Sequence, residues 1–497
     1  MATSITAADT RCVQDTRSTR FSVEGHWWLF CFLILALNFV LLALDPLPKL
    51  FLGDSKSYLW TALWGWIPHD RSFFYGYIIR WSSLRTESLT SLMILQTFLG
   101  AITSILVALI CRWIFQLSLR CSCLFGFLCA IDPLQLVWQR YVMTETISLF
   151  VYVLMLLLSF CYLDQRRLWQ LFVVELLGLL LISFRMSYLL VVQVTMLLLP
   201  LIAFFPEIRT AFCKCSSRTA RMFVARSAGV HMTISILVMM SLQQGYQRLN
   251  GWLAGREPAY LHSSGLTLLA TWAPALQPTD SPDPRLAALL ARREQLRLGD
   301  VGGRNAQLYM PDHLINLWEK TEPNAAICNR VAKQTAVHAL FHRPWRVLKL
   351  SALTFLDYWN FPAMRKKAKA DMKTTSPWDN ELSKAAAKFH VVPPRPQHAK
   401  IYRLLQRYQV IAQPYYYIVL VAPFFCACLI FFVPKGYCFL LCLHSWILLG
   451  TITLFSMGPT ARYLQPLSLL TILIFAVLVK SLTDRRSRAP SAALPTS

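Results

Sequence analysis

Acidic, basic and tyrosine side chains recur in this chain directly beside long apolar segments. The first acid, Asp54, stands in the stretch Gly-Asp-Ser-Lys-Ser-Tyr, about ten residues beyond the first apolar run. A carboxylate near a membrane surface is partly desolvated, which raises its pKa and suits it to accept a proton as a general base. From this residue alone, a solvated loop acid is the more ordinary interpretation.

A second acid, Glu145, opens a later apolar run directly after Thr144. At such a place it either faces a polar cavity or caps its helix. Each nearby arginine would, by itself, be explained by a side chain that reaches lipid headgroups. Together, however, acids and arginines from four separate loops are predicted to share one side of a membrane. The other members of this candidate set are Arg71, Arg80, Arg140, Arg185, Arg462, Tyr58, Tyr75 and Tyr463.

The elements that position these residues are predicted to be membrane-spanning helices. The 497-residue chain is 56% apolar and 15% charged, whereas soluble proteins carry about 25% charged residues. Apolar runs of the length needed to cross a bilayer recur along it. We therefore predict an all-α polytopic membrane protein with about ten transmembrane helices. The predicted spans are 27–44, 91–111, 121–138, 145–163, 168–184, 188–205, 228–243, 413–433, 437–456 and 464–480.

The positive charge is interpreted through the membrane. Lys and Arg number 49 against 25 Asp and Glu, a net charge of +24. Basic residues of membrane proteins orient loops and meet anionic headgroups, so we predict membrane lipids and no nucleic acid as partners. Lys and Arg concentrate in the short loops of one side, including 206–226, which predicts that both termini are cytoplasmic.

Two segments, 45–90 and 244–412, are then predicted to lie outside the membrane on the far side. Within the second, 283–298 has helical apolar spacing, and 345–361 is too short and too charged to span easily. We expect a mixed, mostly helical extracytoplasmic domain with an interfacial helix near 345–361. The predicted organisation is a tail (1–26), an N-terminal transmembrane module (27–243), the domain (244–412), a C-terminal transmembrane module (413–480) and a disordered tail (481–497).

The order and sidedness of these motifs resemble the multi-spanning glycosyltransferases of the GT-C fold, which use polyprenyl-phosphate-linked sugars. The resemblance rests on Gly-Asp-x-x-x-Tyr (Gly53 to Tyr58), Arg-x-x-x-Tyr-Gly (Arg71 to Gly76), Thr144-Glu145, Phe184-Arg185, His-Arg-Pro-Trp (His342 to Trp345) and Arg-Tyr-Leu-x-Pro (Arg462 to Pro466). The chain departs from the family in Ser55, where members often have a second acid, and in Ser72, Phe73 and Met186.

The resemblance implies transfer of a sugar to a glycan, lipid or protein acceptor on the extracytoplasmic face of a bacterial plasma membrane, in assembly of the cell envelope. A sugar on a lipid phosphate already has a good leaving group, so the reaction needs a base and cations that hold the phosphate. Asp54 is the expected base, which implies inversion, and the arginines are expected to bind phosphate. Asp54 with Glu145 forms a weak candidate site for Mg²⁺ or Mn²⁺.

Other function classes remain open on the sequence alone. A polymerase or ligase of lipid-linked glycans is a related alternative, and a transporter or lipid flippase is a different one. Transport is disfavoured because the chain has no evident internal repeat and carries its charges at the edges of the predicted spans. A non-catalytic scaffold is also compatible with the sequence.

Overall fold

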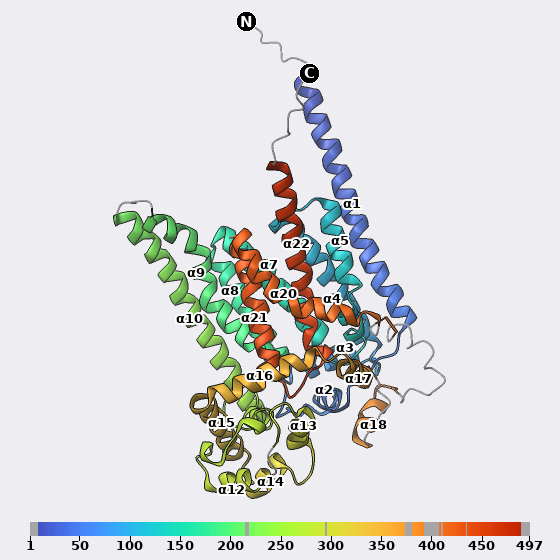
Figure 1. Cartoon of the computed structure of the whole chain (residues 1–497). Helices are drawn as coiled ribbons and strands as arrows, with labels where there is room; N and C mark the ends of the chain where they lie inside the picture. Colours follow the sequence, from blue (N-terminus) through green and yellow to red (C-terminus); the bar gives the residue numbers. More distant parts are fainter. Residues whose placement is uncertain are drawn as a thin grey trace.

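The computed structural model describes residues 8–213, 218–293, 296–372, 380–391, 407–408, 411–433 and 435–488. Their regular structure is helical throughout, with one isolated parallel bridge between Lys49 and Tyr141. The long helices run side by side as a bundle, and a layer of shorter helices lies at one end of it (Figure 1). This confirms the all-α class.

Eight helices in the described residues are long and apolar enough to cross a membrane, as expected for a polytopic membrane protein. Two shorter apolar helices, α5 (Leu119–Ala130) and α8 (Leu168–Phe184), correspond to the remaining predicted spans. The eight helices are α1 (Ala8–Leu44), α4 (Thr90–Leu109, continued by a π-helical turn Ile110–Ile114), α7 (Glu145–Gln165), α9 (Leu189–Cys213), α10 (Arg218–Ala254), α20 (Gln413–Phe432), α21 (Gly436–Leu454) and α22 (Gln465–Arg488).

The expected continuous span 121–138 is wrong. Helix α5 ends at Ala130, and a separate short helix, α6 (Pro133–Trp138), follows. The Asp132 carboxylate accepts a hydrogen bond from the Leu134 amide at 2.8 Å and so caps α6. Pro133 has no amide hydrogen and its ring disfavours a preceding helical turn, so the Asp-Pro pair ends one helix and begins the next.

The segment after α1 forms two helices, α2 (Leu52–Trp64) and α3 (Phe74–Ser83), which pack against each other. Gly76 permits this contact, because a Cβ atom there would lie 2.3 Å from the Thr61 Cβ. Gly65 ends α2 with a φ of +70°, in the left-handed region that glycine adopts without steric cost. Gly65 therefore fixes where α2 ends, and Gly76 allows α3 to pack closely against it.

The second predicted outer segment forms a helical domain with its own apolar core, which includes the buried Trp272 and Trp318. Its expected helix 283–298 is shorter in the structure, where it ends at Arg292. The described helices are α11 (Ser264–Thr271), α12 (Pro284–Arg292), α13 (Val301–Tyr309), α14 (Leu314–Thr321), α15 (Ala325–His342), α16 (Pro344–Tyr358), α17 (Phe361–Met372) and α18 (Asn380–Ala387).

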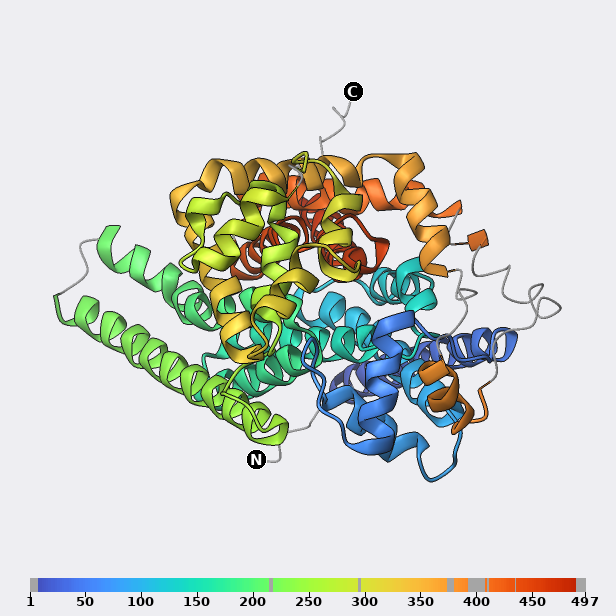
Figure 2. The same ribbon diagram turned by 90° about the horizontal axis from the view of Figure 1, so that it is seen from below.

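Helix α16 covers most of the expected interfacial helix and has 15 residues, which is too few to cross a bilayer. It runs across the end of the bundle (Figure 1) and packs against α21. From that end, the domain helices overlie the C-terminal helices, with α2 and α3 beside them (Figure 2). The described parts of 45–90 and 244–412 therefore share one end of the molecule, opposite the C-terminal end of α9, the N-terminal ends of α1 and α10 and the C-terminal end of α22 (Figure 1).

Candidate active site

Asp54 lies in the first turn of α2 and is held by two arginines from distant parts of the chain. Its Oδ1 is 2.6 Å from the Arg71 Nη1, and its Oδ2 accepts a hydrogen bond from the Arg462 Nη1, also at 2.6 Å. The carboxylate is 21% exposed, so it remains open to solvent on one side. Arg71 comes from the α2–α3 loop, and Arg462 comes from a 3-10 turn, η6 (Ala461–Leu464), that precedes α22.

Glu145, in the first turn of α7, is the second acid of this cluster and is fully buried. Arg462 donates from its Nε to the Glu145 Oε1, so one guanidinium bridges both carboxylates. The Arg185 Nη1 lies 3.6 Å from the same Glu145 oxygen. Thr144 makes no side-chain cap to α7, so the capping interpretation of the Thr-Glu pair is not supported by the structure.

The backbone explains why these arginines reach the cluster. Arg185 stands between the end of α8 and a short 3-10 turn, η2 (Met186–Tyr188), with extended dihedrals of −153° and 111°. Thr460, just before Arg462, is also extended. Each arginine therefore lies where a helix is interrupted, at the domain end of the bundle. Such breaks let side chains from separate helices point into one space.

Aromatic rings pack under the arginines. The Arg185 and Arg462 guanidiniums lie 5.4 Å and 5.7 Å from the centre of the Tyr463 ring. Arg71 lies 5.7 Å from the Tyr58 ring, which in turn meets Tyr75 edge to face at 4.9 Å. Cation–π contacts of this kind stabilise desolvated guanidiniums and keep their planar faces in place.

The two arginines set the protonation state of Asp54. Burial raises the pKa of the carboxyl, but Arg462 and Arg71 lower it more, and the net pKa is well below its ordinary value of 3.8. The expected net rise in the pKa of Asp54 is therefore wrong, because it took account of desolvation and omitted the paired arginines. Nearby, burial is the main cause that raises the pKa of Tyr58 to about 12. At neutral pH, Asp54 is a carboxylate and Tyr58 a phenol.

Two residues of the candidate set lie elsewhere. Arg80 is exposed at the end of α3, near the Gly65 turn. Arg140 is fully buried, and its Nη1 donates to the Thr97 Oγ1 at 3.1 Å. The structure brings together Asp54, Glu145, Arg71, Arg185, Arg462, Tyr58 and Tyr463, with Tyr75 reaching the group through Tyr58.

Two further residues belong to this cluster. Asp70 pairs with the Arg71 Nη2 at 2.5 Å, and the ring of Phe51 lies 5.4 Å from the Arg462 guanidinium. Asp70 adjoins Arg71 in the sequence, so an acidic partner for that arginine could have been anticipated. Phe51 carries no such signal, since an apolar residue before a helix has many ordinary roles.

A cation shared by Asp54 and Glu145 stays a prediction and does not fit this arrangement well. Arg462 lies between the two carboxylates and already neutralises the oxygens that a metal would need. In the described part of the chain, no group of three or more His, Cys, Asp or Glu residues is arranged to hold a metal ion. We therefore derive no chemical step through a metal.

Comparisons with known proteins returned nothing: no family model, no curated protein and no solved structure matches this chain. Support for a function therefore comes from the residues of the cluster and their surroundings.

Proposed function

We propose that this protein is a membrane glycosyltransferase. It would move a sugar from a polyprenyl-phosphate donor to a glycan, lipid or protein acceptor on the extracytoplasmic face of a bacterial plasma membrane, with inversion at the anomeric carbon. The observation that supports this most is the bridge made by Arg462 between Asp54 and Glu145 at the domain end of the bundle. It places an ionised carboxylate beside several guanidiniums where a lipid phosphate can arrive.

In this proposal, the acceptor hydroxyl oxygen attacks the anomeric carbon, and the bond from that carbon to the phosphate oxygen breaks. Asp54 takes the hydroxyl proton, and polyprenyl phosphate leaves with the electron pair. Arg185 and Arg462 would hold the phosphate, because a guanidinium matches phosphate oxygens with two parallel hydrogen bonds. The charge that develops on the leaving group would be stabilised by cations already in place.

The low pKa of Asp54 in the free protein makes it a weak base, and the same geometry suggests how it would strengthen. A bound phosphate competes with Asp54 for Arg462. Once Arg462 turns to the phosphate, Asp54 loses one of its two cations but keeps its partial burial, and both changes raise its pKa. The base would then become competent only when the donor is bound.

The alternative of a polytopic transporter or flippase is less well supported. Transport sites usually lie near the bilayer midplane, at broken helices in repeated halves. The charged cluster here lies at helix ends, next to the outer domain. A polymerase or ligase of lipid-linked glycans stays a related alternative, because it would use the same arginines for phosphate.

The deciding experiment is turnover of the Asp54→Asn protein with polyprenyl-phosphate sugars. Turnover should fall by about 10²–10⁴-fold, the usual contribution of a positioned acid–base group. Folding should largely survive, because Arg71 still forms its ion pair with Asp70 and Arg462 still forms its ion pair with Glu145.

Asp312→Asn is the matched control, because Asp312 is 78% exposed and its ion-pair partner among the described residues is Lys320, on the surface. Near-normal turnover of well-folded Asp54→Asn protein would refute the proposed mechanism and make Glu145 the next candidate base.

A further inference from the structure

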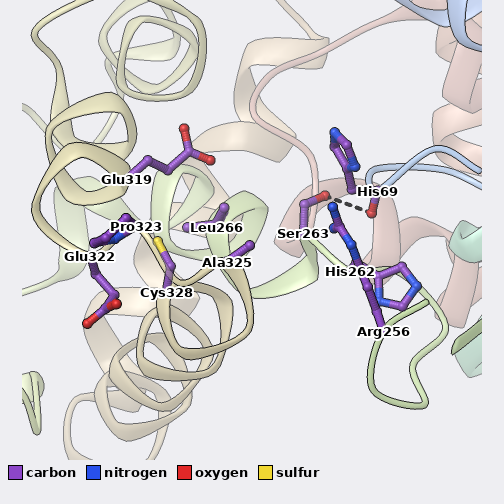
Figure 3. Close-up of a pocket in the computed structure, with 10 residues that line it drawn as sticks. All are labelled: His69, Arg256, His262, Ser263, Leu266, Glu319, Glu322, Pro323, Ala325 and Cys328. Carbon is purple, nitrogen blue, oxygen red and sulfur yellow. Dashed lines mark hydrogen bonds between the residues drawn. The ribbon is translucent and has the colours of Figure 1, made fainter. Parts of the chain in front are cut away.

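A cavity of about 260 Å³ lies between the first outer segment and the outer domain (Figure 3). His69 lines it from the α2–α3 loop, and its carbonyl accepts hydrogen bonds from the Ser263 amide at 3.0 Å and the Ser263 hydroxyl at 3.1 Å. Two residues further along that loop, Arg71 holds Asp54. The cavity is thus tied to the candidate active site through a short stretch of backbone.

The walls of this cavity carry charges of both signs. Arg256 lies on one side with two imidazoles, and Glu319 lies across from it (Figure 3). Among the described residues, neither Arg256 nor Glu319 forms an ion pair. Burial, and then Arg256, lower the pKa of His262, which keeps that imidazole neutral at pH 7. The cavity therefore offers the Arg256 cation, the Glu319 carboxylate and the neutral imidazole of His262.

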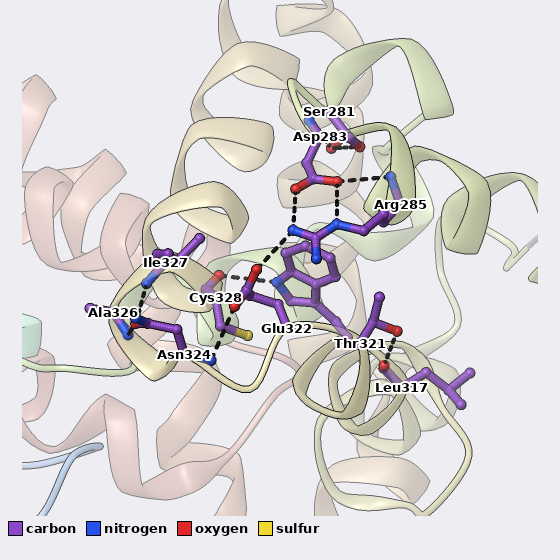
Figure 4. A network of polar contacts seen from close by, with 11 residues as sticks. Ser281, Asp283, Arg285, Leu317, Thr321, Glu322, Asn324, Ala326, Ile327 and Cys328 are labelled. Atoms are coloured by element: carbon purple, nitrogen blue, oxygen red, sulfur yellow. Dashed lines mark hydrogen bonds and ion pairs between the residues drawn. The ribbon is translucent and has the colours of Figure 1, made fainter.

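One acid of the cavity lining, Glu322, is held in place by neighbouring residues. Glu322 accepts from the Arg285 Nη2 at 2.8 Å and from the Asn324 amide at 3.1 Å, and Arg285 also pairs with Asp283 (Figure 4). The Glu322 carboxylate is therefore already hydrogen-bonded within the protein and is not counted as a group that faces the ligand. The floor is apolar: Leu266 and Ala325 line it beside Cys328, whose pKa burial raises to about 12, so the thiol stays protonated.

These features select the chemistry of a ligand. An acyl chain would desolvate Arg256 and Glu319 without compensation. An anion would meet the Glu319 carboxylate, and a cation would meet Arg256. A neutral polyol satisfies both signs, because each hydroxyl both donates and accepts a hydrogen bond. The apolar floor would accept the C–H face of a sugar ring.

We infer that this cavity binds a neutral sugar unit of the acceptor. The inference rests on the proposed function and narrows the acceptor to a glycan, or to a carrier that presents one. Helix α14, which contributes Glu319, lies beyond the end of the bundle (Figure 1). A donor whose phosphate binds the arginine cluster would come from the membrane side, which leaves the domain side for the acceptor.

The experiment is saturation-transfer NMR of the full-length protein with three neutral disaccharides, maltose, lactose and mannobiose. Glucuronic acid and octanoate serve as the anionic and acyl probes. At least one disaccharide should bind, and Arg256→Ala and Glu319→Ala should each weaken that binding about tenfold, because each removes a charged hydrogen-bonding partner. Arg292→Ala and Glu257→Ala are matched controls, because both residues are exposed and neither lines the cavity.

Binding of a disaccharide that is unchanged in both cavity variants would overturn the inference, as would preferential binding of glucuronic acid or octanoate, or no disaccharide signal at all. None of these readouts requires turnover. An inactive protein that binds a disaccharide in the cavity would refute the proposed function alone, whereas an active protein that binds none of the three would refute this inference alone.

Discussion

At the residue scale, Arg462 connects the two acids of the candidate site. It contacts Asp54, Glu145, Tyr463 and Phe51, and its side chain is 14% exposed. The sequence placed Arg462 and Asp54 on one side of a membrane, and their motifs suggested a shared role. Nothing in the spacing indicated that one guanidinium would bridge both carboxylates, because Arg462 lies 408 positions from Asp54 and 317 from Glu145 in the chain.

Arg462→Ala should weaken binding of the donor lipid by about 1.5–3 kcal/mol, the range for a hydrogen bond to a charged group. Arg462→Lys should restore only part of this, because an ammonium cannot form the two parallel bonds of a guanidinium. Donor affinity would be measured by titration of the detergent-solubilised protein. Arg80→Ala is the control, since Arg80 is exposed and outside the cluster. Equal donor affinity of Arg462→Ala and wild type would contradict a role in phosphate binding and favour the interpretation that Arg462 contacts lipid headgroups.

The pH profile provides an independent check on Asp54. Because Arg462 and Arg71 hold its pKa below 3.8 in the free protein, Asp54 stays deprotonated as the pH falls from 8 to 5. The kcat/KM, which reports groups of the free enzyme, should therefore show no acidic decline from Asp54 in that window. Activity should be lost only as the pH falls below about 4. An acidic limb centred between pH 6 and 7 would assign the base to another residue.

At the scale of single elements, the apolar periodicity predicted most helices, and it was wrong where local backbone chemistry intervened. The run 121–138 is apolar enough to be taken for one span, yet Asp132-Pro133 divides it. The Asp-Pro pair was visible in the sequence as a helix-ending signal, but the high hydropathy of the whole segment favoured the prediction of one span. The packing of α2 on α3 had no such signal, because a glycine in a helix does not reveal what its missing side chain would meet.

Two glycines of the resemblance motifs are expected to respond differently to substitution. Gly76→Ala should destabilise the protein by about 1–3 kcal/mol, because the new Cβ would overlap Thr61 and press on the Tyr58 carbonyl. Gly53→Ala should leave stability unchanged or slightly raised, since nothing lies within 4 Å and alanine favours a helix. Thermal unfolding of both variants in one detergent measures the difference. Equal melting temperatures would mean that α2 and α3 do not pack as described.

At the scale of the whole molecule, the polytopic class followed from composition, because few folded soluble chains are so apolar and so weakly charged. The shared end of the two outer segments followed from the alternation of spans. The internal packing of the outer domain did not, because its short helices have polar faces and irregular links. The tail 481–497 was predicted to be disordered; residues 481–488 instead continue helix α22, and residues 489–497 lie outside the described residues.

The sidedness prediction can be tested with single introduced cysteines and a membrane-impermeant maleimide on intact cells. Glu257→Cys tests an exposed position three residues beyond the C-terminal end of α10, which lies at the domain end, and Arg209→Cys tests an exposed position near the C-terminal end of α9, which lies at the opposite end. Labelling should appear at position 257 and be absent at 209 until the cells are opened. The native Cys328 is unsuitable, since it is buried. Labelling of position 209 in intact cells would reverse the orientation.

Helix α10 is longer than a helix needs to be to cross a bilayer. It has 37 residues and is therefore about 55 Å long, well beyond the roughly 30 Å of a hydrocarbon core. Little of its apolar stretch is buried inside the protein, although the helix packs along α9 and α8. Its far end holds Ser72 through Tyr246 and holds the chain before His262 through Asn250. A change of about five degrees in the tilt of α10 would move that end by about 5 Å, so we expect membrane thickness to affect the spacing between Arg71 and the proposed sugar cavity.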